Sequence, residues 1–172
     1  GDFYVSLQKH DWYYQSNKPE YYFAREHVPE GGNVLEVGCG RGEFRKFLPD
    51  NTKYKGLEFN SAALQAARAQ GLDVQMRPVE DEAKNCPANF DVVCHFQVLE
   101  HVTDPRSFLQ ACSDLLRPGG TLIVAVPSED SFLCLAESSW LNMPPHHLTR
   151  WSDRALSRAL ESVGIKLQTV WH

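Results

Sequence analysis

The sequence predicts an α/β fold, with a doubly wound and mainly parallel sheet between layers of helices. Short apolar runs alternate along the chain with helical stretches of about ten residues, as expected where crossover helices join parallel strands. A cluster of glycines follows the first apolar run, and 42% of the 172 residues are hydrophobic, which is enough for one buried core. Ligands of such sheets bind beyond the carboxyl ends of the strands, so we expect the functional residues in the turns after the strands.

The first half of the chain predicts three strands and two helices. In chain order, the strands cover residues 34–37, 54–59 and 74–79, and the helices cover residues 41–48 and 62–70. Pro49 closes the first helix, because proline has no amide hydrogen with which to continue it. Asn60 or Ser61 caps the second helix, which is rich in alanine and ends before Gly71.

The second half predicts three further strands and two helices. The strands cover residues 90–96, 121–126 and 165–170, and the helices cover residues 104–116 and 152–163. The first of these strands is almost continuously apolar, as a strand covered on both faces requires. Asp104 begins one helix and Ser152 caps the other. Residues 128–150 have no clear period, and we expect them to form a long insertion after the fifth strand.

The chain is predicted to form one domain preceded by an appendage. Residues 1–30 are polar and rich in aromatic side chains, including Tyr4, Trp12 and Tyr21. Residues 31–172 hold the alternating strands and helices, without internal repeats or low-complexity linkers. The aromatic segment can pack as a helix over a ligand, as a lid would, or dock onto the core.

Charge and composition exclude several classes of partner. The 22 acidic and 17 basic residues give a net charge of −5, and no run of Lys or Arg could follow a phosphate backbone, so we expect no nucleic-acid partner. No apolar stretch approaches the roughly 20 residues of a membrane helix, so we expect no membrane partner. The five cysteines form no CxxC pair and lie mostly in apolar runs, which favours reduced thiols and a cytoplasmic protein.

The glycine-rich turn carries the first functional signal. Gly38, Gly40 and Gly42 alternate between a strand and a helix, which lets the backbone bend sharply and approach a ligand closely. Glu58 lies 20 residues beyond Gly38, at the end of the second strand, where a carboxylate can accept hydrogen bonds from both ribose hydroxyls. The pattern predicts a nucleotide-like ligand, and on its own it also suits a nicotinamide-dependent oxidoreductase.

Two carboxylates distinguish between these ligands. Glu36 precedes the glycines, and Glu43 stands where GxGxxG has its third glycine. Carboxylates near a helix N-terminus would repel a pyrophosphate, but they suit a ligand that carries an ammonium and a sulfonium. In the alternative interpretation, Glu36 only caps backbone amides and Glu43 only complements the helix dipole. The charges and the GxGxG spacing together disfavour a nicotinamide dinucleotide.

Segments in a fixed order resemble the motifs of class I S-adenosylmethionine-dependent methyltransferases, whose fold is Rossmann-like. They are VLEVGCGRG at residues 34–42, GLEF at 56–59, FDVV at 90–93 with VLEHV at 98–102, and LLRPGGTL at 115–122. The segments are most similar to the subgroup that includes ubiquinone-biosynthesis O-methyltransferases, as is PPHHLTRWS at residues 144–152. The resemblance implies that S-adenosylmethionine is the cofactor. We expect a small molecule to accept the methyl group at oxygen or nitrogen, although the sequence leaves a protein side chain open as the acceptor.

The resemblance also implies a role for individual residues near the cofactor. Around the methionine part, Gly38, Cys39 and Gly40 line the ligand, and Glu36 anchors the loop or the amino group. His95 offers a backbone carbonyl to the amino group, and Phe96 offers an apolar side chain to the sulfur. Around the nucleoside part, Glu58 holds the ribose, Phe59 packs on adenine, and Val79 and Glu80 approach the adenine amino group. Without the resemblance, Phe59 and Phe96 would equally suit an ordinary core.

Methyl transfer to oxygen or nitrogen requires removal of a proton, and histidine is the natural base. We favour His146 or His147, because they lie in the insertion after the fifth strand, with His101 and His95 as further candidates. These histidines can equally be loop or capping residues. We expect no metal, because two adjacent histidines without a nearby cysteine or carboxylate cluster make a poor ligand set.

One feature departs from the family that the motifs resemble. That family normally inserts a seventh, antiparallel strand between strands five and six, whereas this chain stops at His172. Either the sequence is a piece of a longer protein or the sheet is closed in another way. An open edge would expose backbone hydrogen-bonding groups and favour a homodimer. A binding module that keeps the pocket without turnover is the alternative function from another class.

Overall fold

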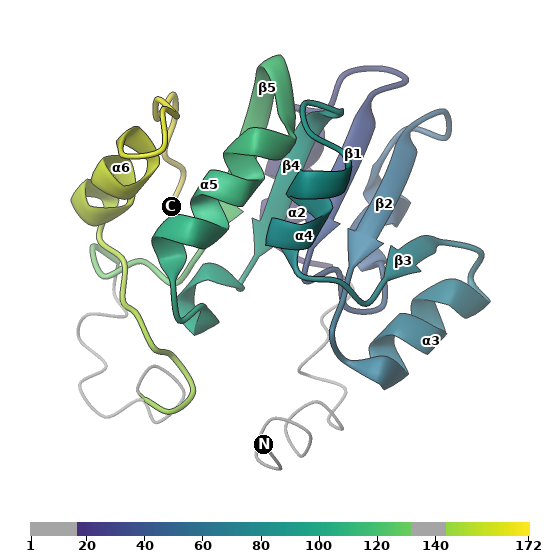
Figure 1. Ribbon diagram of the computed structural model, residues 1–172, viewed down its shortest axis with the longest axis horizontal. Helices are drawn as coiled ribbons and strands as arrows, with labels where there is room; N and C mark the ends of the chain where they lie inside the picture. The colour runs from purple at the N-terminus through teal and green to yellow at the C-terminus, as the bar shows by residue number, and fades with distance from the viewer. Residues whose placement is uncertain (1–16, 132–143) are drawn as a thin grey trace.

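The computed structural model describes residues 17–131 and 144–172. Within them, five parallel strands form one sheet in the order β3-β2-β1-β4-β5 (Figure 1). The strands are β1 (Asn33–Val37), β2 (Lys53–Leu57), β3 (Asp73–Gln75), β4 (Phe90–Phe96) and β5 (Leu116–Ala125). The chain runs from β1 to one edge and then returns past β1 to the other. This is the predicted doubly wound sheet, and its ligand crevice is expected where the order reverses, between β1 and β4.

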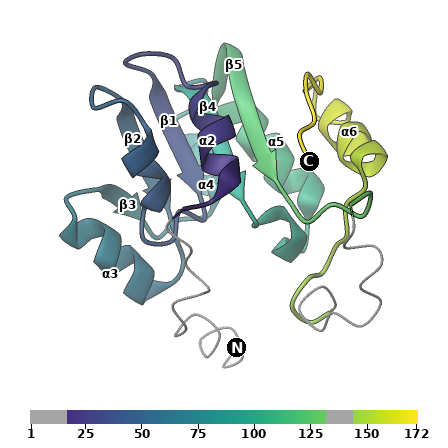
Figure 2. The same cartoon turned by 180° about the vertical axis from the view of Figure 1, so that it is seen from behind.

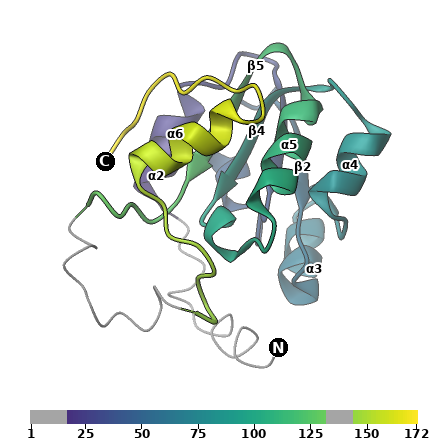
Figure 3. The same cartoon turned by 60° about the vertical axis from the view of Figure 1, so that its left-hand side comes forward.

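Helices α4 (Val79–Asn85), α5 (Pro105–Leu115) and α6 (Asp153–Glu161) cover one face of the sheet and follow one another along it (Figure 3). The apolar side of α5 carries Phe108, Leu109 and Cys112, which pack with Leu35 and Val93 of the central strands. Removing this apolar surface from water stabilises the fold by about 25 cal/mol per Å². The near-continuous apolar character of β4 is explained by helices on both of its faces.

Helix α2 (Pro19–Arg25) and the 3-10 helix η1 (Glu43–Phe47) cover the opposite face (Figure 2). Tyr21 of α2 is buried, and its ring centroid lies 5.3 Å from that of Phe44 and 5.0 Å from that of Phe96. The later part of the aromatic segment is therefore docked onto the core. Residues 1–16, the rest of the predicted lid, lie outside the described residues, as do residues 132–143 of the predicted insertion.

Side-chain caps begin three helices at predicted residues. Asn60 Oδ1 accepts a hydrogen bond of 2.9 Å from the Ala63 amide at the start of α3 (Ser61–Ala69), which packs beside β3. Asp104 caps α5 and Ser152 caps α6 in the same way, with distances of 3.1 and 3.2 Å. Each cap contributes about 1 kcal/mol. The predicted cap residues and the bounds of β4 are confirmed.

Two predicted elements are shorter or different, and one helix was not predicted. Instead of a helix over residues 41–48, the chain forms the five-residue η1, which starts after a left-handed Gly42 and ends before Pro49. The predicted strand over residues 74–79 ends at Gln75, and Val79 begins α4, a helix that the sequence analysis missed. Pro78 cannot donate to a strand ladder, and three acidic residues in the first turn of α4 complement the helix dipole.

The predicted final strand at residues 165–170 is wrong. This segment has no regular secondary structure, and within the described ranges it does not pair with the open edge of β5. Its apolar residues Ile165 and Leu167 pack instead against the core cluster that contains α5. Trp171 stacks on Phe23 of α2, with ring centroids 5.7 Å apart. Apolar packing, rather than strand pairing, therefore holds the segment.

The structure describes four of the five cysteines and most of the chain in which a membrane span was sought. Cys39, Cys86, Cys94 and Cys112 are free thiols. In the residues that the structure describes, no helix has both the length and the apolar character needed to span a bilayer.

Replacing Glu82 with Gln is expected to lower the free energy of unfolding by about 3 kcal/mol, because one partner of a buried ion pair is lost. Its buried carboxylate contacts Lys55 Nζ at 2.6 Å and Arg77 Nη1 at 2.8 Å. Burial alone would raise the carboxyl pKa, but these two cations outweigh it, and the pKa is lowered. The contribution is therefore present above about pH 4.5 and is lost as the pH falls. Urea denaturation of wild type and Glu82→Gln, at pH 7 and at acid pH, measures this difference in the free energy of unfolding.

Asp81→Asn is the matched control for this prediction. Asp81 pairs with Lys84 on the same helix, but both side chains are exposed. Exposed pairs contribute little to stability. An equal loss of stability in Asp81→Asn and Glu82→Gln would contradict the special role of the buried carboxylate.

Candidate active site

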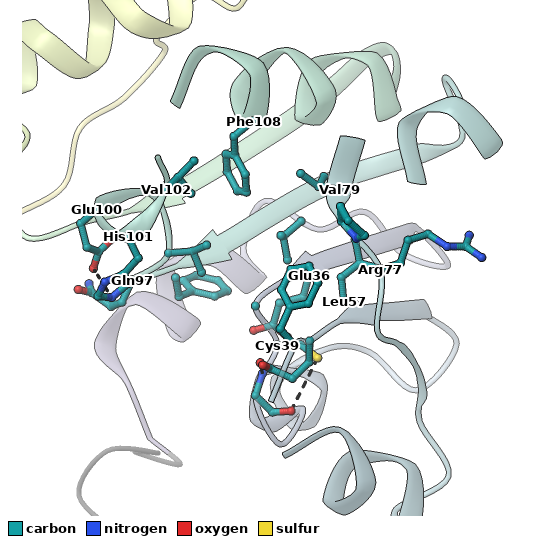
Figure 4. Close-up of a pocket in the computed structure, with 18 of the residues that line it drawn as sticks. Glu36, Cys39, Leu57, Arg77, Val79, Gln97, Glu100, His101, Val102 and Phe108 are labelled. Atoms are coloured by element: carbon teal, nitrogen blue, oxygen red, sulfur yellow. Dashed lines mark hydrogen bonds and ion pairs between the residues drawn. The ribbon is translucent and has the colours of Figure 1, made fainter. Parts of the chain in front are cut away.

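One cavity of about 700 Å³ opens at the carboxyl ends of β1, β2 and β4 (Figure 4). It lies where the strand order reverses, as expected for a doubly wound sheet. Predicted residues that line it are Glu36, Gly38, Cys39, Gly40, Glu58, Phe59, Val79, Glu80, Phe96, His101, His146 and His147. The structure thus brings all of the predicted cofactor residues except His95, and three of the candidate histidines, to the walls of a single cavity.

The glycine-rich loop is tied to the end of β2. The Gly38 and Cys39 amides both donate to the Leu57 carbonyl, at 2.8 and 3.1 Å. Gly38 has a φ of 71°, and a Cβ at this position would lie 2.5 Å from Val98 Cγ2. Only glycine fits this conformation and this close approach without strain. The loop therefore presents bare backbone to the cavity.

Glu58 holds the loop from the other side. Its Oε2 accepts a 2.8 Å hydrogen bond from the Gly40 amide, and its Oε1 accepts a 2.6 Å hydrogen bond from the Asn60 amide. A carboxylate has about four lone-pair sites, so two backbone bonds leave capacity for further donors. Glu58 lines the cavity and can accept from vicinal hydroxyls while it fixes the loop.

Glu36 forms part of the cavity wall beneath the loop. Its side chain is buried, and Tyr54 Oη donates a 2.5 Å hydrogen bond to Oε2. Burial raises the pKa of Glu36 to about 8, although the hydrogen bond from Tyr54 opposes the rise. A cation bound nearby would favour the ionised form and lower this pKa. The site is therefore suited to a positively charged group.

The remaining predicted cofactor residues divide into two groups. Phe59 is 65% exposed and lines the cavity, so its ring is available to stack on a planar ligand. Val79 and Glu80 lie in the first turn of α4, and Phe96 ends β4 beside Tyr21. His95 does not line the cavity. Its ring is buried against Phe108 in the core, where burial lowers its pKa to about 3.

Three histidines from distant parts of the sequence meet at one end of the cavity. His101 lies in the 3-10 helix η2 (Leu99–His101) after β4, and His146 and His147 lie in the insertion after β5. The three ring centroids lie 4.8 to 4.9 Å apart. Burial lowers the pKa of all three imidazoles, that of His147 to about 4, and repulsion among the rings lowers those of His146 and His147 further. The rings are therefore neutral near pH 7.

Hydrogen bonds fix the two segments of this cluster to each other. His101 Nδ1 lies 2.7 Å from the His146 carbonyl, and since a carbonyl only accepts, Nδ1 carries the hydrogen. The Leu148 and Thr149 amides donate to the Glu100 carbonyl at 2.7 and 3.2 Å. The histidine cluster is thus supported by backbone contacts and is not a chance meeting of side chains.

Several residues of the cavity wall were missed by sequence analysis. Lys18 and Tyr21 come from the start of α2, which a proline at its first turn could have indicated. Gln97 and Val98 come from the turn after β4. Gln97 has a φ of 58°, a left-handed conformation that few residues other than glycine adopt, and the sequence carries no signal for it.

The model of a methyltransferase domain family matches residues 11–170 of the chain. The chain belongs to this family. The domain is related to methyltransferases that use S-adenosylmethionine as their methyl donor. The loop at Gly38, the carboxylate of Glu58 and the acidic wall at Glu36 fit a ligand that combines a ribose with a cationic amino acid.

Two curated relatives support the assignment of the methyltransferase domain. The ubiquinone biosynthesis O-methyltransferase of Xanthomonas campestris pv. campestris is 34% identical over 113 residues, which are 62% of this chain and 47% of the relative. A probable S-adenosylmethionine-dependent methyltransferase of Mycolicibacterium smegmatis is 32% identical over 144 residues, which are 83% of this chain and 55% of the relative. The chain thus spans about half the length of the curated relatives it matches.

Solved structures confirm the Rossmann-like fold of the methyltransferase domain. A methyltransferase in complex with the Haloferax volcanii Trm112 methyltransferase activator has 25% identity and a TM-score of 0.73, over 87% of this chain and 68% of that chain. An S-adenosylmethionine-dependent methyltransferase from Thermotoga maritima has 24% identity and a TM-score of 0.70, over 84% and 69% of the two chains. The family assignment disfavours the nicotinamide-dependent alternative.

Binding of S-adenosylmethionine by the domain is expected to release a proton below about pH 8. The pKa of Glu36 is about 8 in the free protein, and an ammonium group nearby would lower it. Affinity should therefore rise with pH until Glu36 is ionised in the free protein too. Calorimetric titrations at pH 6.5 in two buffers of different ionisation enthalpy measure the released protons.

The variant Glu36→Gln distinguishes the two roles that the sequence leaves open for Glu36. If Glu36 faces the amino group, the variant binds more weakly and releases fewer protons. If Glu36 only anchors the loop through Tyr54, wild type and variant show the same buffer dependence, and the electrostatic interpretation is wrong.

Proposed function

We propose that the chain transfers a methyl group from S-adenosylmethionine to oxygen or nitrogen of a small molecule. The observation that carries the proposal is that one cavity joins the loop at Gly38 and Glu58 to the neutral cluster of His101, His146 and His147. The first part suits the donor, and the second part suits removal of a proton from the acceptor. The names of the ubiquinone-biosynthesis relatives support a small-molecule acceptor.

In this proposal, S-adenosylmethionine supplies an electrophilic methyl group that needs no further activation. Glu58 accepts hydrogen bonds from the ribose, Phe59 and Glu80 contact adenine, and Glu36 faces the amino group. The loop from Gly38 to Gly40 follows the methionine part, with Phe96 beside the sulfur. The protein then has to hold the acceptor in line with the methyl group.

The histidine cluster acts on the acceptor. A neutral imidazole of His146 or His147 accepts the acceptor proton as the new bond to the methyl carbon forms and the bond from carbon to sulfur breaks. Tyr21 and Phe96 provide apolar surface that limits the access of water. His101 supports the pair through its hydrogen bond to the His146 carbonyl.

A radiolabelled methyl-transfer assay tests the proposed function. Purified protein is incubated with methyl-labelled S-adenosylmethionine and a panel of phenols, catechols, amines and carboxylates. The proposal expects label in at least one small molecule, and none when Glu58 is replaced by Ala. Cofactor binding with label transferred only to added protein would contradict the proposed acceptor. Cofactor binding with no transfer of label at all would contradict the proposed activity.

A homodimer through the edge of β5 is still a prediction. In the described part of the chain, β5 ends the sheet and has a strand partner on one side only. Unpaired edges favour pairing with a second chain. Light scattering at high protein concentration should show a dimer, and a monomer at all concentrations would contradict the prediction.

A further inference from the structure

The histidine end of the cavity contains a buried carboxyl group that the proposed mechanism does not use. The side chain of Glu100 is 1% exposed, and among the described residues neither carboxyl oxygen has a hydrogen-bond partner. Its Oε1 lies 4.0 Å from His101 Nε2, and Figure 4 shows the two side chains together at one end of the cavity. A buried carboxyl group without hydrogen bonds costs free energy unless a ligand compensates it.

The three imidazoles beside Glu100 have the geometry of a ligand set. One ligand atom from each of His101, His146 and His147 can be chosen so that all lie within 4.8 Å of one another. Tetrahedral zinc with bonds of about 2.0–2.1 Å to nitrogen places its ligand atoms about 3.3 Å apart. The rings would therefore need to close by about 1.5 Å at most, which is within the range of side-chain rotation.

The surroundings also fix the state of the ligand nitrogens. The His146 carbonyl accepts from His101 Nδ1, so Nε2 is the nitrogen of His101 with a lone pair. Metal-bound histidines usually donate their other ring nitrogen to a carbonyl or carboxylate in this way. The Leu148 and Thr149 amides hold the two segments together through the Glu100 carbonyl. Ligands and supporting groups are therefore both present.

We propose that His101, His146, His147 and Glu100 bind one transition-metal dication, such as Zn²⁺, at the acceptor end of the cavity. Three nitrogen donors and one carboxylate favour zinc or another first-row metal over magnesium or calcium, which prefer oxygen ligands. From the sequence we expected no metal, because His146 and His147 alone make a poor ligand set. The fold adds a third imidazole and the missing carboxylate.

The proposed site suggests the class of acceptor. A dication at this position could take an acceptor hydroxyl as a further ligand and lower its pKa, so that the hydroxyl would lose its proton to water before the methyl group is transferred. The imidazoles would then serve as ligands, and the cation would replace them in activating the acceptor. This role in turnover rests on the proposed function, whereas binding of the metal does not.

Metal binding is tested with tag-free protein freed of metal by a chelator. Calorimetry with Zn²⁺ should show one saturable site per chain. Co²⁺ should give visible ligand-field bands without the near-ultraviolet band of a thiolate ligand, since no cysteine is in the set. His147→Ala removes a nitrogen ligand and should weaken Zn²⁺ binding by about 100-fold. Glu100→Gln removes the carboxylate charge and should weaken Zn²⁺ binding by about 10-fold.

His27→Ala is the matched control. His27 is exposed and lies just after the C-terminus of α2. Its Nδ1 contacts the Phe23 carbonyl, and His27 is not part of the histidine cluster. Its replacement should leave Zn²⁺ binding unchanged. Glu100→Gln keeps the shape of the side chain, so it provides a second test if His147→Ala lowers the thermal midpoint.

The possible results separate the metal site from the proposed function. S-Adenosylhomocysteine is titrated into the same protein samples, and its binding should survive in His147→Ala and Glu100→Gln. Absence of a one-to-one Zn²⁺ site in wild type, or equal affinity in wild type, His147→Ala and Glu100→Gln, would overturn the metal site even if methyl transfer is observed. Zn²⁺ binding without S-adenosylhomocysteine binding would retain the site and contradict the proposed function.

Discussion

Glu58→Ala is expected to weaken binding of S-adenosylmethionine by about 100-fold or more. The Glu58 carboxylate accepts from the Gly40 and Asn60 amides and lines the cavity, so it can also accept from the ribose hydroxyls. Hydrogen bonds to a charged group contribute about 1.5–3 kcal/mol each, and about 1.4 kcal/mol corresponds to a tenfold change in affinity. Loss of two such bonds and of the loop support accounts for the expected effect. Calorimetry with S-adenosylhomocysteine measures it.

Two variants control for the loss of negative charge at Glu58. Glu58→Gln keeps the shape but places an amide hydrogen where a backbone amide donates, so its affinity should also fall. Glu30→Gln removes an exposed carboxylate that contacts Asn51, far from the cavity wall, and should bind like wild type. If Glu58→Gln retained wild-type affinity, the carboxylate would not be the ribose anchor.

His147→Ala is expected to reduce turnover by about 100-fold or more while the affinity for S-adenosylmethionine changes little. Its imidazole is kept neutral by burial and by the neighbouring rings, and it lines the cavity beside His101 and His146. General-base catalysis contributes about 10²–10⁴-fold to rate. A metal ligand at this position would give the same separation of turnover from cofactor affinity. Initial rates at saturating cofactor, combined with calorimetry, measure both quantities.

His146→Ala provides the companion measurement for the histidine pair. His146 is more buried than His147, and its carbonyl accepts from His101, so its backbone role survives the substitution. A fall in turnover in one variant but not in the other would identify the residue that takes the proton. Unchanged turnover in both variants would remove the pair from the mechanism.

Local signals in the sequence predicted the donor half of the cavity. Alternating glycines, a carboxylate after the second strand and the caps at Asn60 and Asp104 are each defined by a few neighbouring residues, and the structure contains them as expected. Glycine is needed at Gly38 because of its left-handed backbone and its approach to Val98. Such requirements are visible in sequence because they restrict residue type.

Features that depend on distant contacts were not predictable in the same way. Residues 165–170 have strand-like composition, but in the described residues Ile165 and Leu167 pack against the core instead of pairing with the open edge of β5. Tyr21 enters the cavity wall because α2 docks on β4, which the aromatic composition alone left open. The meeting of His146 with His101 and Glu100, which are neighbours in sequence, depends on contacts across about 45 residues of chain.

The proposed function depends most directly on binding of S-adenosylmethionine in the cavity, between the loop at Gly38 and the side chain of Glu58. Calorimetric titration of the purified protein with S-adenosylhomocysteine, accompanied by thermal melting, is the most direct measurement. We expect one site per chain and a raised melting midpoint, both lost in Glu58→Ala. Neither heat nor a shift of the midpoint in the folded wild-type protein, with either the donor or its demethylated product, would contradict the central claim.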